Sequence, residues 1–137
     1  MAVSTGGCAC GGVRYHVDGP LRQVVACHCE QCRRSSGHFV AATATRRRYF
    51  HLTSSADLRW YEALSGFRRG FCATCGSSLF FERIGEDRMS IAAGSLDDAR
   101  GLSIAAHIFI GEAGAYYAIG DTVQQSRDGQ FSADLPP

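Results

Sequence analysis

Residues 27–34 read CHCEQCRR and place three cysteines within eight residues. Four more cysteines form two close pairs elsewhere in the chain, Cys8 with Cys10 and Cys72 with Cys75. Seven cysteines cannot pair fully in disulfides within one chain, and disulfides are rare in reducing compartments. Such close spacings are typical of metal coordination, whereas inert core thiols are usually scattered. We therefore predict that the cysteines bind metal, and buried inert thiols are the alternative.

Composition limits the class of protein. With 137 residues the chain is long enough for one domain with a real core. The net charge of +1 predicts no broad attraction to nucleic acid or membrane. No run approaches the roughly 20 apolar residues of a membrane span, and the start MAVSTGG lacks the features of a signal peptide. We expect a cytoplasmic protein with neither nucleic acid nor membrane as a partner.

The remaining sequence reads mainly as short strands separated by turns such as the SG at 65–66. Strands are predicted over 13–17, 39–45, 49–53, 58–63, 78–84, 88–96 and 106–111. One short helix is predicted to begin near Cys29 and to stop at Gly37. The fold class is therefore mainly β, with antiparallel sheets stapled by metal sites. Residues 1–120 are expected to form the domain, and residues 121–137 a polar surface tail.

Spacing suggests how the seven thiols divide. Cys8 and Cys10 lie two residues apart and point the same way if they are on a strand. The sequence FCATCG at 71–76 predicts a knuckle, a tight turn that brings two sulfurs to one point. The two pairs together would make one tetrahedral site, leaving three cysteines for a second metal. Spacing alone does not exclude the alternative, in which the knuckle completes the site of the central three.

Seven thiolates cannot close two four-coordinate sites without another donor. His28 is the nearest, but on an extended backbone it points away from its cysteine neighbours. His38 or His107 can close the site instead, as can water or the thiol of a substrate. Three protein ligands with one exchangeable position are typical of catalytic zinc.

Several motifs carry a family resemblance. They are GGCACGGVRYHV at 6–17, CHCEQCRRSSG at 27–37, GFCATCGSSLFF at 70–81, AAGSLDD at 92–98 and HIF at 107–109. The sequence resembles the glutathione-dependent formaldehyde-activating enzyme (GFA) family, also called the CENP-V/GFA domain. The resemblance implies a zinc-stapled β-tent fold with two Zn²⁺ per chain. It implies a structural zinc on Cys8, Cys10, Cys72 and Cys75, and an open catalytic zinc on Cys27, Cys29 and Cys32.

A zinc held by three thiolates is a weak Lewis acid, better suited to activating a thiol than to making hydroxide. The resemblance implies a reversible carbon–sulfur lyase of the S-(hydroxymethyl)glutathione synthase type. Glutathione, or another small thiol, would add to formaldehyde or to another small electrophile. His28 and His107 are candidates for proton transfer because imidazole titrates near neutral pH.

Four arginines flank the cysteines. Arg33 and Arg34 follow the central cluster and can clamp a carboxylate of the substrate through paired hydrogen bonds. Alternatively, they only offset the negative charge of the cluster. Arg68 and Arg69 precede the knuckle and are expected to neutralise its thiolates.

Three other interpretations remain open. The protein is a non-catalytic zinc-stabilised binding module if a histidine closes the central site. A second interpretation is a nucleic-acid-binding zinc ribbon, but the near-neutral charge and the lack of a long basic tail argue against it. An iron–sulfur cluster on the central cysteines would need a fourth ligand.

Overall fold

The computed structural model describes residues 3–64, 66–130 and 135–137. Eleven strands are present: β1 (Ser4–Gly7), β2 (Arg14–Val17), β3 (Val24–Cys27), β4 (Val40–Thr45), β5 (Phe50–Ser54), β6 (Leu58–Leu64), β7 (Phe67–Cys72), β8 (Ser78–Arg83), β9 (Met89–Ala92), β10 (Ile104–Ile108) and β11 (Gln124–Gln125). They are joined by one α-helix, α1 (Glu30–Ser36), and three single-turn 3₁₀ helices, η1 (Arg47–Tyr49), η2 (Ala93–Ser95) and η3 (Ile110–Glu112). Parts of three sequence predictions lie outside the described residues: the start at 1–2, residue 65 of the turn at 65–66, and 131–134 of the tail.

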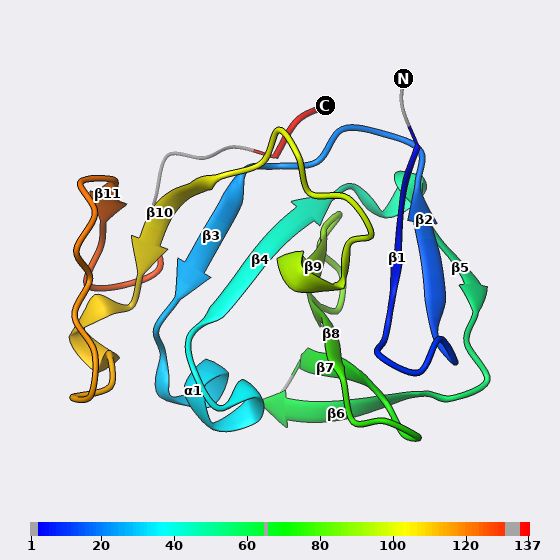
Figure 1. Cartoon of the computed structure of the whole chain (residues 1–137), viewed down its shortest axis with the longest axis horizontal. Coiled ribbons are helices and arrows are strands. Elements are labelled where there is room, and N and C mark those ends of the chain that lie inside the picture. The colour runs from blue at the N-terminus through cyan, green and yellow to red at the C-terminus, as the bar shows by residue number, and fades with distance from the viewer. Residues whose placement is uncertain (1–2, 65, 131–134) are drawn as a thin grey trace.

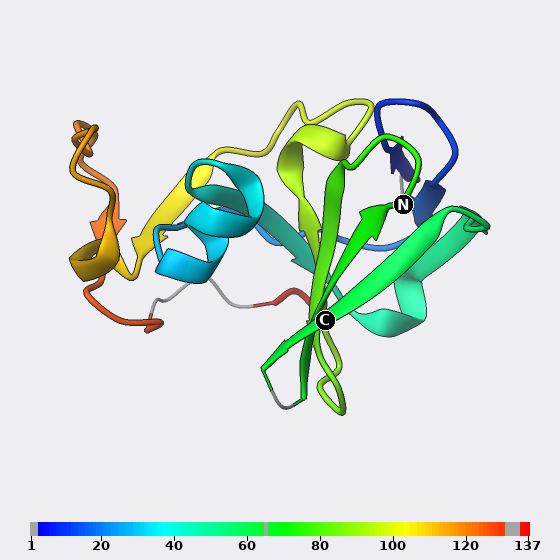
Figure 2. The same cartoon turned by 90° about the horizontal axis from the view of Figure 1, so that it is seen from below.

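The strands form two sheets (Figure 1). One has three strands in the order β1-β2-β5, and the other has eight in the order β11-β10-β3-β4-β9-β8-β7-β6. Neighbouring strands are antiparallel except at one edge, where β10 runs parallel to both β3 and β11. Figure 2 shows the larger sheet strongly curved, with β6, β7 and β8 turned away from the plane of β3 and β4. The predicted mainly β class is confirmed.

The core lies between the two sheets. In the segment that ends in β2, alternate residues Val13, Tyr15 and Val17 are buried, as the two-residue period of a strand requires. The Tyr15 hydroxyl lies 2.7 Å from the hydroxyl of Ser95, so its polar end is satisfied inside the core. The other buried members of the cluster are Leu58, Cys72, Leu79, Phe80, Met89, Ile91 and Leu96.

The predicted short helix is confirmed as α1, which lies at the ends of β3 and β4 (Figure 1). Cys29 is its N-cap, and the Cys29 sulfur accepts a hydrogen bond from the backbone N–H of Cys32 at 3.2 Å. Gly37 ends the helix with a left-handed φ of 86°, and its N–H donates to the carbonyl of Arg33. A potential metal ligand is therefore also the residue that starts the helix.

One buried carboxylate joins β8 to its surroundings. The side chain of Glu82 is only 3% exposed and accepts hydrogen bonds from Arg47 and Arg68, each at 2.6 Å. Arg68, on β7, also lies over the ring of Trp60 on the neighbouring strand β6. The carboxylate therefore ties η1 to the β6–β7 hairpin.

We expect Glu82→Gln to lower the free energy of unfolding by about 2–3 kcal/mol, because two charge-assisted hydrogen bonds to a buried group are weakened. Urea unfolding followed by circular dichroism measures the change. Glu86→Gln is the matched control, since Glu86 pairs with Arg83 and Arg88 at the surface. That substitution should change stability by less than about 0.5–1 kcal/mol. Equal losses in the two variants would contradict the role given to Glu82.

The domain boundary predicted at residue 120 stays a prediction. The segment after it contributes β11, which pairs with β10 at the sheet edge. The Ser126 N–H donates to the carbonyl of His107, and the Phe109 N–H donates to the carbonyl of Asp128. Within the described residues, no helix combines the length and apolar character needed to cross a membrane.

Candidate metal centres and cavity

Four cysteine sulfurs from two distant segments of the sequence, one near the N-terminus and one near the middle of the chain, meet at one point. Cys8, Cys10, Cys72 and Cys75 place all their sulfurs within 4.8 Å of one another. The sulfur of Cys10 lies 3.6 Å from that of Cys8 and 3.7 Å from that of Cys72. Four sulfurs at about 2.3 Å from a tetrahedral metal would be about 3.8 Å apart. The spacing therefore fits a four-thiolate metal centre.

Hydrogen-bond donors surround the sulfurs of this four-cysteine centre and favour the thiolate at Cys75. The hydrogen bond from the Gly12 N–H favours the thiolate of Cys10, but hydrogen bonds to Cys8 and Cys75 outweigh it and raise the pKa of Cys10 to about 12. Each sulfur has a backbone N–H or hydroxyl within hydrogen-bond distance: Val13 N for Cys8, Gly12 N for Cys10, Cys75 N for Cys72 and Ser77 Oγ for Cys75. Hydrogen bonds from the side chain and backbone of Ser77 lower the pKa of Cys75 to about 5. Donors aimed at sulfur stabilise the charged form, which is the form that binds a metal.

Three of these sulfurs come from segments outside the strands, and the fourth belongs to Cys72, the last residue of β7. The expectation that Cys8 and Cys10 share a strand face is wrong, because β1 ends before Cys8 and Cys10 lies in a turn. The predicted knuckle is present after β7. The Gly76 N–H donates to the carbonyl of Cys72 at 2.8 Å, and Gly76 has a φ of 79°, which glycine adopts without strain.

The other three cysteines form a separate centre at the end of β3. Cys27 is the last residue of β3, Cys29 caps α1 and Cys32 is buried in the first turn of the helix. Their sulfurs lie within 4.8 Å of one another. Among the residues that the structure describes, no histidine or carboxylate joins this group. The three-cysteine centre can hold a metal and offers it three protein ligands.

The negative charge at this centre concentrates on one sulfur. Hydrogen bonds from the Cys27 and Cys32 thiols lower the pKa of Cys29 to about 2. The pKa of Cys27 is raised, first by its hydrogen bond to Cys29. The Arg69 guanidinium lies 3.6 Å from the Cys32 sulfur. These hydrogen bonds favour the thiolate form of Cys29, which is the form that binds a metal, and the Arg69 guanidinium offsets part of the negative charge that three thiolates would carry.

The three-cysteine centre opens into a cavity of about 600 Å³, within the range of small-molecule sites. Its lining combines the three cysteines with arginine, aromatic and aliphatic side chains. The lining residues are Arg22, Val25, Cys27, Cys29, Glu30, Gln31, Cys32, Val40, Ala42, Phe67, Arg69, Phe81, Arg88, Ser90, Ile108, Phe109, Glu112 and Gly129. Phe109 has a φ of 53°, the only positive value at a non-glycine residue in the described part of the chain. Such strain tends to occur at functional sites.

The arginines are arranged differently from the sequence expectation. Arg69 lies beside Cys32 in the cavity, so its expected role at the knuckle thiolates is wrong. Arg68 pairs with Glu82, so the same expectation is wrong for this residue too. Arg34 is 72% exposed and pairs with Glu30.

Two residues of the cavity were missed by sequence reasoning. Arg22 and Arg88 line it, yet neither lies near a cysteine in the sequence. Arg33, which the sequence did single out, is not among the lining residues, and its buried Nε atom has no hydrogen-bond partner among the described residues. No spacing signal links Arg22 or Arg88 to the motif at 27–34, so only the folded sheet shows their position.

The histidines lie away from the three-cysteine centre. The His28 ring is buried, with Nε2 lying 2.9 Å from Nδ1 of His107 and Nδ1 lying 2.5 Å from the Tyr117 hydroxyl. His107 continues the chain to Asp121 at 2.8 Å. Burial, followed by the neighbouring His107, lowers the pKa of His28. His38 contacts the Tyr116 hydroxyl instead of a cysteine. These histidines therefore supply no fourth ligand in this arrangement.

Comparison with known proteins assigns the family. No curated protein matches the sequence. The structure is similar to the crystal structure of a Rhodobacter sphaeroides protein from a structural genomics programme, with a TM-score of 0.55 and 23% identity over 72% of this chain and 90% of that chain. This likeness concerns the fold alone. Residues 3–112 match the family described as glutathione-dependent formaldehyde-activating enzyme. With four-cysteine and three-cysteine centres inside the matched region, the chain belongs to the glutathione-dependent formaldehyde-activating enzyme family.

Proposed function

We propose that the protein is a zinc-dependent carbon–sulfur lyase or synthase that adds glutathione, or a related thiol, to formaldehyde or another small electrophile. The reaction is reversible. One observation carries the proposal: a group of three cysteines, with no fourth protein ligand among the described residues, opens into a cavity that also contains arginine. The family assignment supports the choice of thiol and aldehyde.

Each cysteine centre is proposed to hold one Zn²⁺, two per chain. Thiolate sets suit zinc, and closed four-thiolate sites are typically structural. At the three-cysteine centre, bound zinc would supply a positive charge that keeps a substrate thiol deprotonated. The zinc ion would be held by Cys27, Cys29 and Cys32, whose backbones are fixed by β3 and the first turn of α1.

The proposed reaction joins the substrate thiol to the aldehyde through a new carbon–sulfur bond. The sulfur of the substrate thiolate attacks the carbonyl carbon with a lone pair, and a carbon–sulfur bond forms. The π electrons of the carbonyl move to its oxygen, which takes up a proton equivalent to the one that the thiol released, and the product is a hemithioacetal. The reverse direction returns that proton and breaks the carbon–sulfur bond. The apolar walls contributed by Phe67, Phe81 and Phe109 would limit water around the reacting atoms.

Proton transfer by His28 stays a prediction that the geometry does not favour. Both ring nitrogens of His28 are within hydrogen-bond distance of other groups, and His28 does not line the cavity. Substrate binding by Arg33 and Arg34 also stays a prediction. Arg69 is the better candidate for a carboxylate of the thiol substrate, because its guanidinium lies in the cavity and next to Cys32.

We expect Arg69→Ala to raise the KM for glutathione by about tenfold or more, the effect of losing one hydrogen bond to a charged group. Arg34→Ala is the matched comparison, since Arg34 is exposed and pairs with Glu30. Steady-state kinetics at fixed formaldehyde measures both, and metal content shows whether the three-cysteine centre stays loaded. A larger rise in KM for Arg34→Ala than for Arg69→Ala would show that Arg34, and not Arg69, binds the carboxylate of the substrate.

The proposed function is tested by following adduct formation between glutathione and formaldehyde in two-dimensional exchange NMR. The zinc-loaded protein should increase the exchange rate above that of the spontaneous reaction. The comparison is the same protein with Cys29 replaced by serine. Exchange at the spontaneous rate with loaded wild-type protein, for glutathione and for other small thiols, would leave the non-catalytic binding module as the function.

A further inference from the structure

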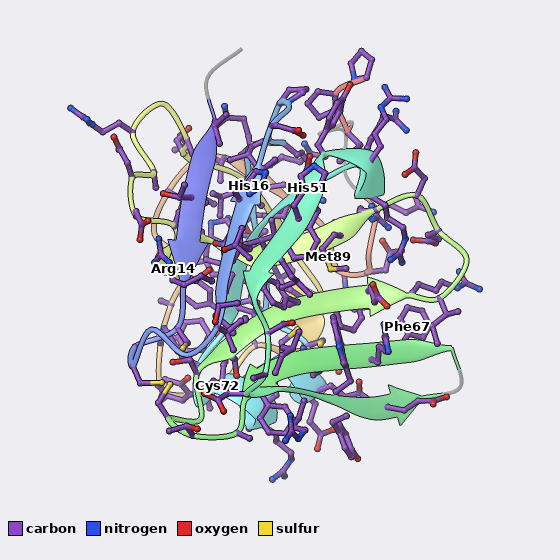
Figure 3. All side chains as sticks on the ribbon, turned by 90° about the vertical axis from the view of Figure 1, so that its right-hand side faces the viewer. Arg14, His16, His51, Phe67, Cys72 and Met89 are labelled. Carbon is purple, nitrogen blue, oxygen red and sulfur yellow. The ribbon has the colours of Figure 1, made fainter. Side chains whose placement is uncertain are left out.

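A third group of potential metal ligands lies on the three-stranded sheet and contains no cysteine. His16 on β2 and His51 on β5 are cross-strand partners, and their rings stack with centroids 4.7 Å apart. Asp18 follows β2, and its Oδ2 lies 3.2 Å from Nε2 of His51. Figure 3 shows the two histidines beside each other on neighbouring strands. The cysteine chemistry proposed above makes no use of this group.

The sheet holds the three side chains on its outer face. Tyr15 and Val17 point into the core, so His16 between them points outward. The Asp18 N–H donates to the carbonyl of Tyr49 at 3.0 Å, which anchors the aspartate beside the start of β5. The side chains of His51 and Asp18 are 42% and 46% exposed. The backbone positions are therefore held, while the side chains remain accessible to an ion.

We propose that His16, Asp18 and His51 form a third metal site, which takes a divalent transition ion such as Zn²⁺ or Ni²⁺. Their donor atoms lie within 4.8 Å of one another. Two imidazoles and one carboxylate suit zinc and nickel, whereas thiolates select softer metals. The site therefore differs from the two cysteine centres in its donor atoms, which are imidazole nitrogen and carboxylate oxygen and accept Ni²⁺ as well as Zn²⁺.

Small side-chain rotations bring the donors to coordination distance. Donors about 2.0–2.2 Å from one tetrahedral metal ion lie roughly 3.3–3.6 Å apart. Facing residues on antiparallel strands have Cβ atoms about 4.5–5.5 Å apart, so two imidazoles can reach a shared ion without movement of the backbone. Arg14, the neighbouring cation on this face of β2, pairs with Asp97, which offsets its repulsion of a metal. The bound ion would replace the hydrogen bond between His51 and Asp18.

Metal bound here would link two strands of the smaller sheet. β5 is an edge strand, and β2 is the central strand of the order β1-β2-β5. An ion that binds only the folded protein stabilises it in proportion to the logarithm of its concentration over the dissociation constant. Nickel should therefore raise the melting temperature of a protein that already carries zinc on its cysteines.

The test uses the untagged protein of 137 residues, loaded with two equivalents of zinc so that only the cysteine centres are filled. Isothermal titration with Ni²⁺ should show one additional equivalent per chain, without zinc release as measured by a chromogenic chelator. H16Q and H51Q should each weaken this binding by at least tenfold and remove the rise in melting temperature. D18N should weaken binding less than either histidine substitution. H38Q is the matched control and should bind Ni²⁺ as the wild type does, since His38 lies elsewhere and contacts Tyr116.

Location supplies an independent readout. Octahedral Ni²⁺ is paramagnetic, so bound nickel should broaden the amide NMR signals of β2 and β5 before those of the knuckle or α1. Absence of an additional equivalent in the wild type would overturn the proposal. So would nickel binding that persists in both H16Q and H51Q, or that displaces zinc from the cysteines.

Discussion

Replacing Cys72 with serine is expected to unfold the protein. Cys72 is fully buried, belongs to the core cluster and is one of the four ligands of the four-cysteine centre. The free energy of binding structural zinc to small zinc domains is roughly 10–16 kcal/mol. The whole free energy of unfolding of a typical domain is about 5–15 kcal/mol, so loss of the metal can remove all of it. The centre joins the turn between β1 and β2 to the knuckle after β7. Its loss would release both segments together.

Circular dichroism at 25 °C and metal content per chain measure this effect. Cys75→Ser separates the metal from the core, because Cys75 belongs to the same centre but is exposed. If metal binding is the cause, Cys75→Ser should be severely destabilised and lose one zinc. If burial of Cys72 is the cause, Cys75→Ser should fold normally. Ser77→Ala keeps all four ligands but removes the hydroxyl beside the Cys75 sulfur, which also accepts a hydrogen bond from the Ala9 N–H, and should cost about 1–2 kcal/mol.

Replacing Cys29 with serine is expected to lower the activity by about a thousandfold or more, the scale on which an enzyme loses rate without an essential group. Zinc content should fall from two per chain to one. The fold should survive, because serine is a good N-cap and can accept the hydrogen bond from the Cys32 N–H that begins α1. The variant therefore removes a metal ligand while keeping the local structure.

Cys29→Ala is the matched comparison. It removes the same metal ligand and also the N-cap of α1. Its free energy of unfolding should therefore be about 1 kcal/mol lower than that of Cys29→Ser. The residual activities of the two variants should be equal. Exchange NMR gives the activity, and thermal unfolding gives the stability. Full activity in Cys29→Ser, or its complete unfolding, would show that the three-cysteine centre is structural.

Local patterns in the sequence predicted several elements well. The alternation in VRYHV corresponds to β2, and EQCRRSS followed by Gly37 corresponds to α1 with its left-handed cap. The strand predicted at 88–96 is correct only at its start, since β9 ends at Ala92 and η2 follows. Signals that depend on two to eight neighbouring residues are those that the sequence carries most clearly.

Other strands were not predicted because their signal is not local. β1 contains two glycines, β3 is a four-residue run ending in a cysteine, and β7 contains two arginines and a glycine. Each becomes a strand because neighbouring strands supply its hydrogen bonds. The parallel pairing of β3 with β10 likewise joins segments far apart in the chain.

The sequence by itself determined the mainly β class, the helix after Cys29, the knuckle and the presence of cysteine sets suited to metal. These follow from spacing, turn chemistry and periodicity, which act between near neighbours. Tertiary structure alone decided which sets meet, because a site shared by Cys8 and Cys72 depends on how the sheets pack. It also decided that Arg69 faces the three-cysteine centre and that His16 stands beside His51. The physical reason is that contacts between distant segments are set by strand register and sheet curvature, which no local pattern encodes.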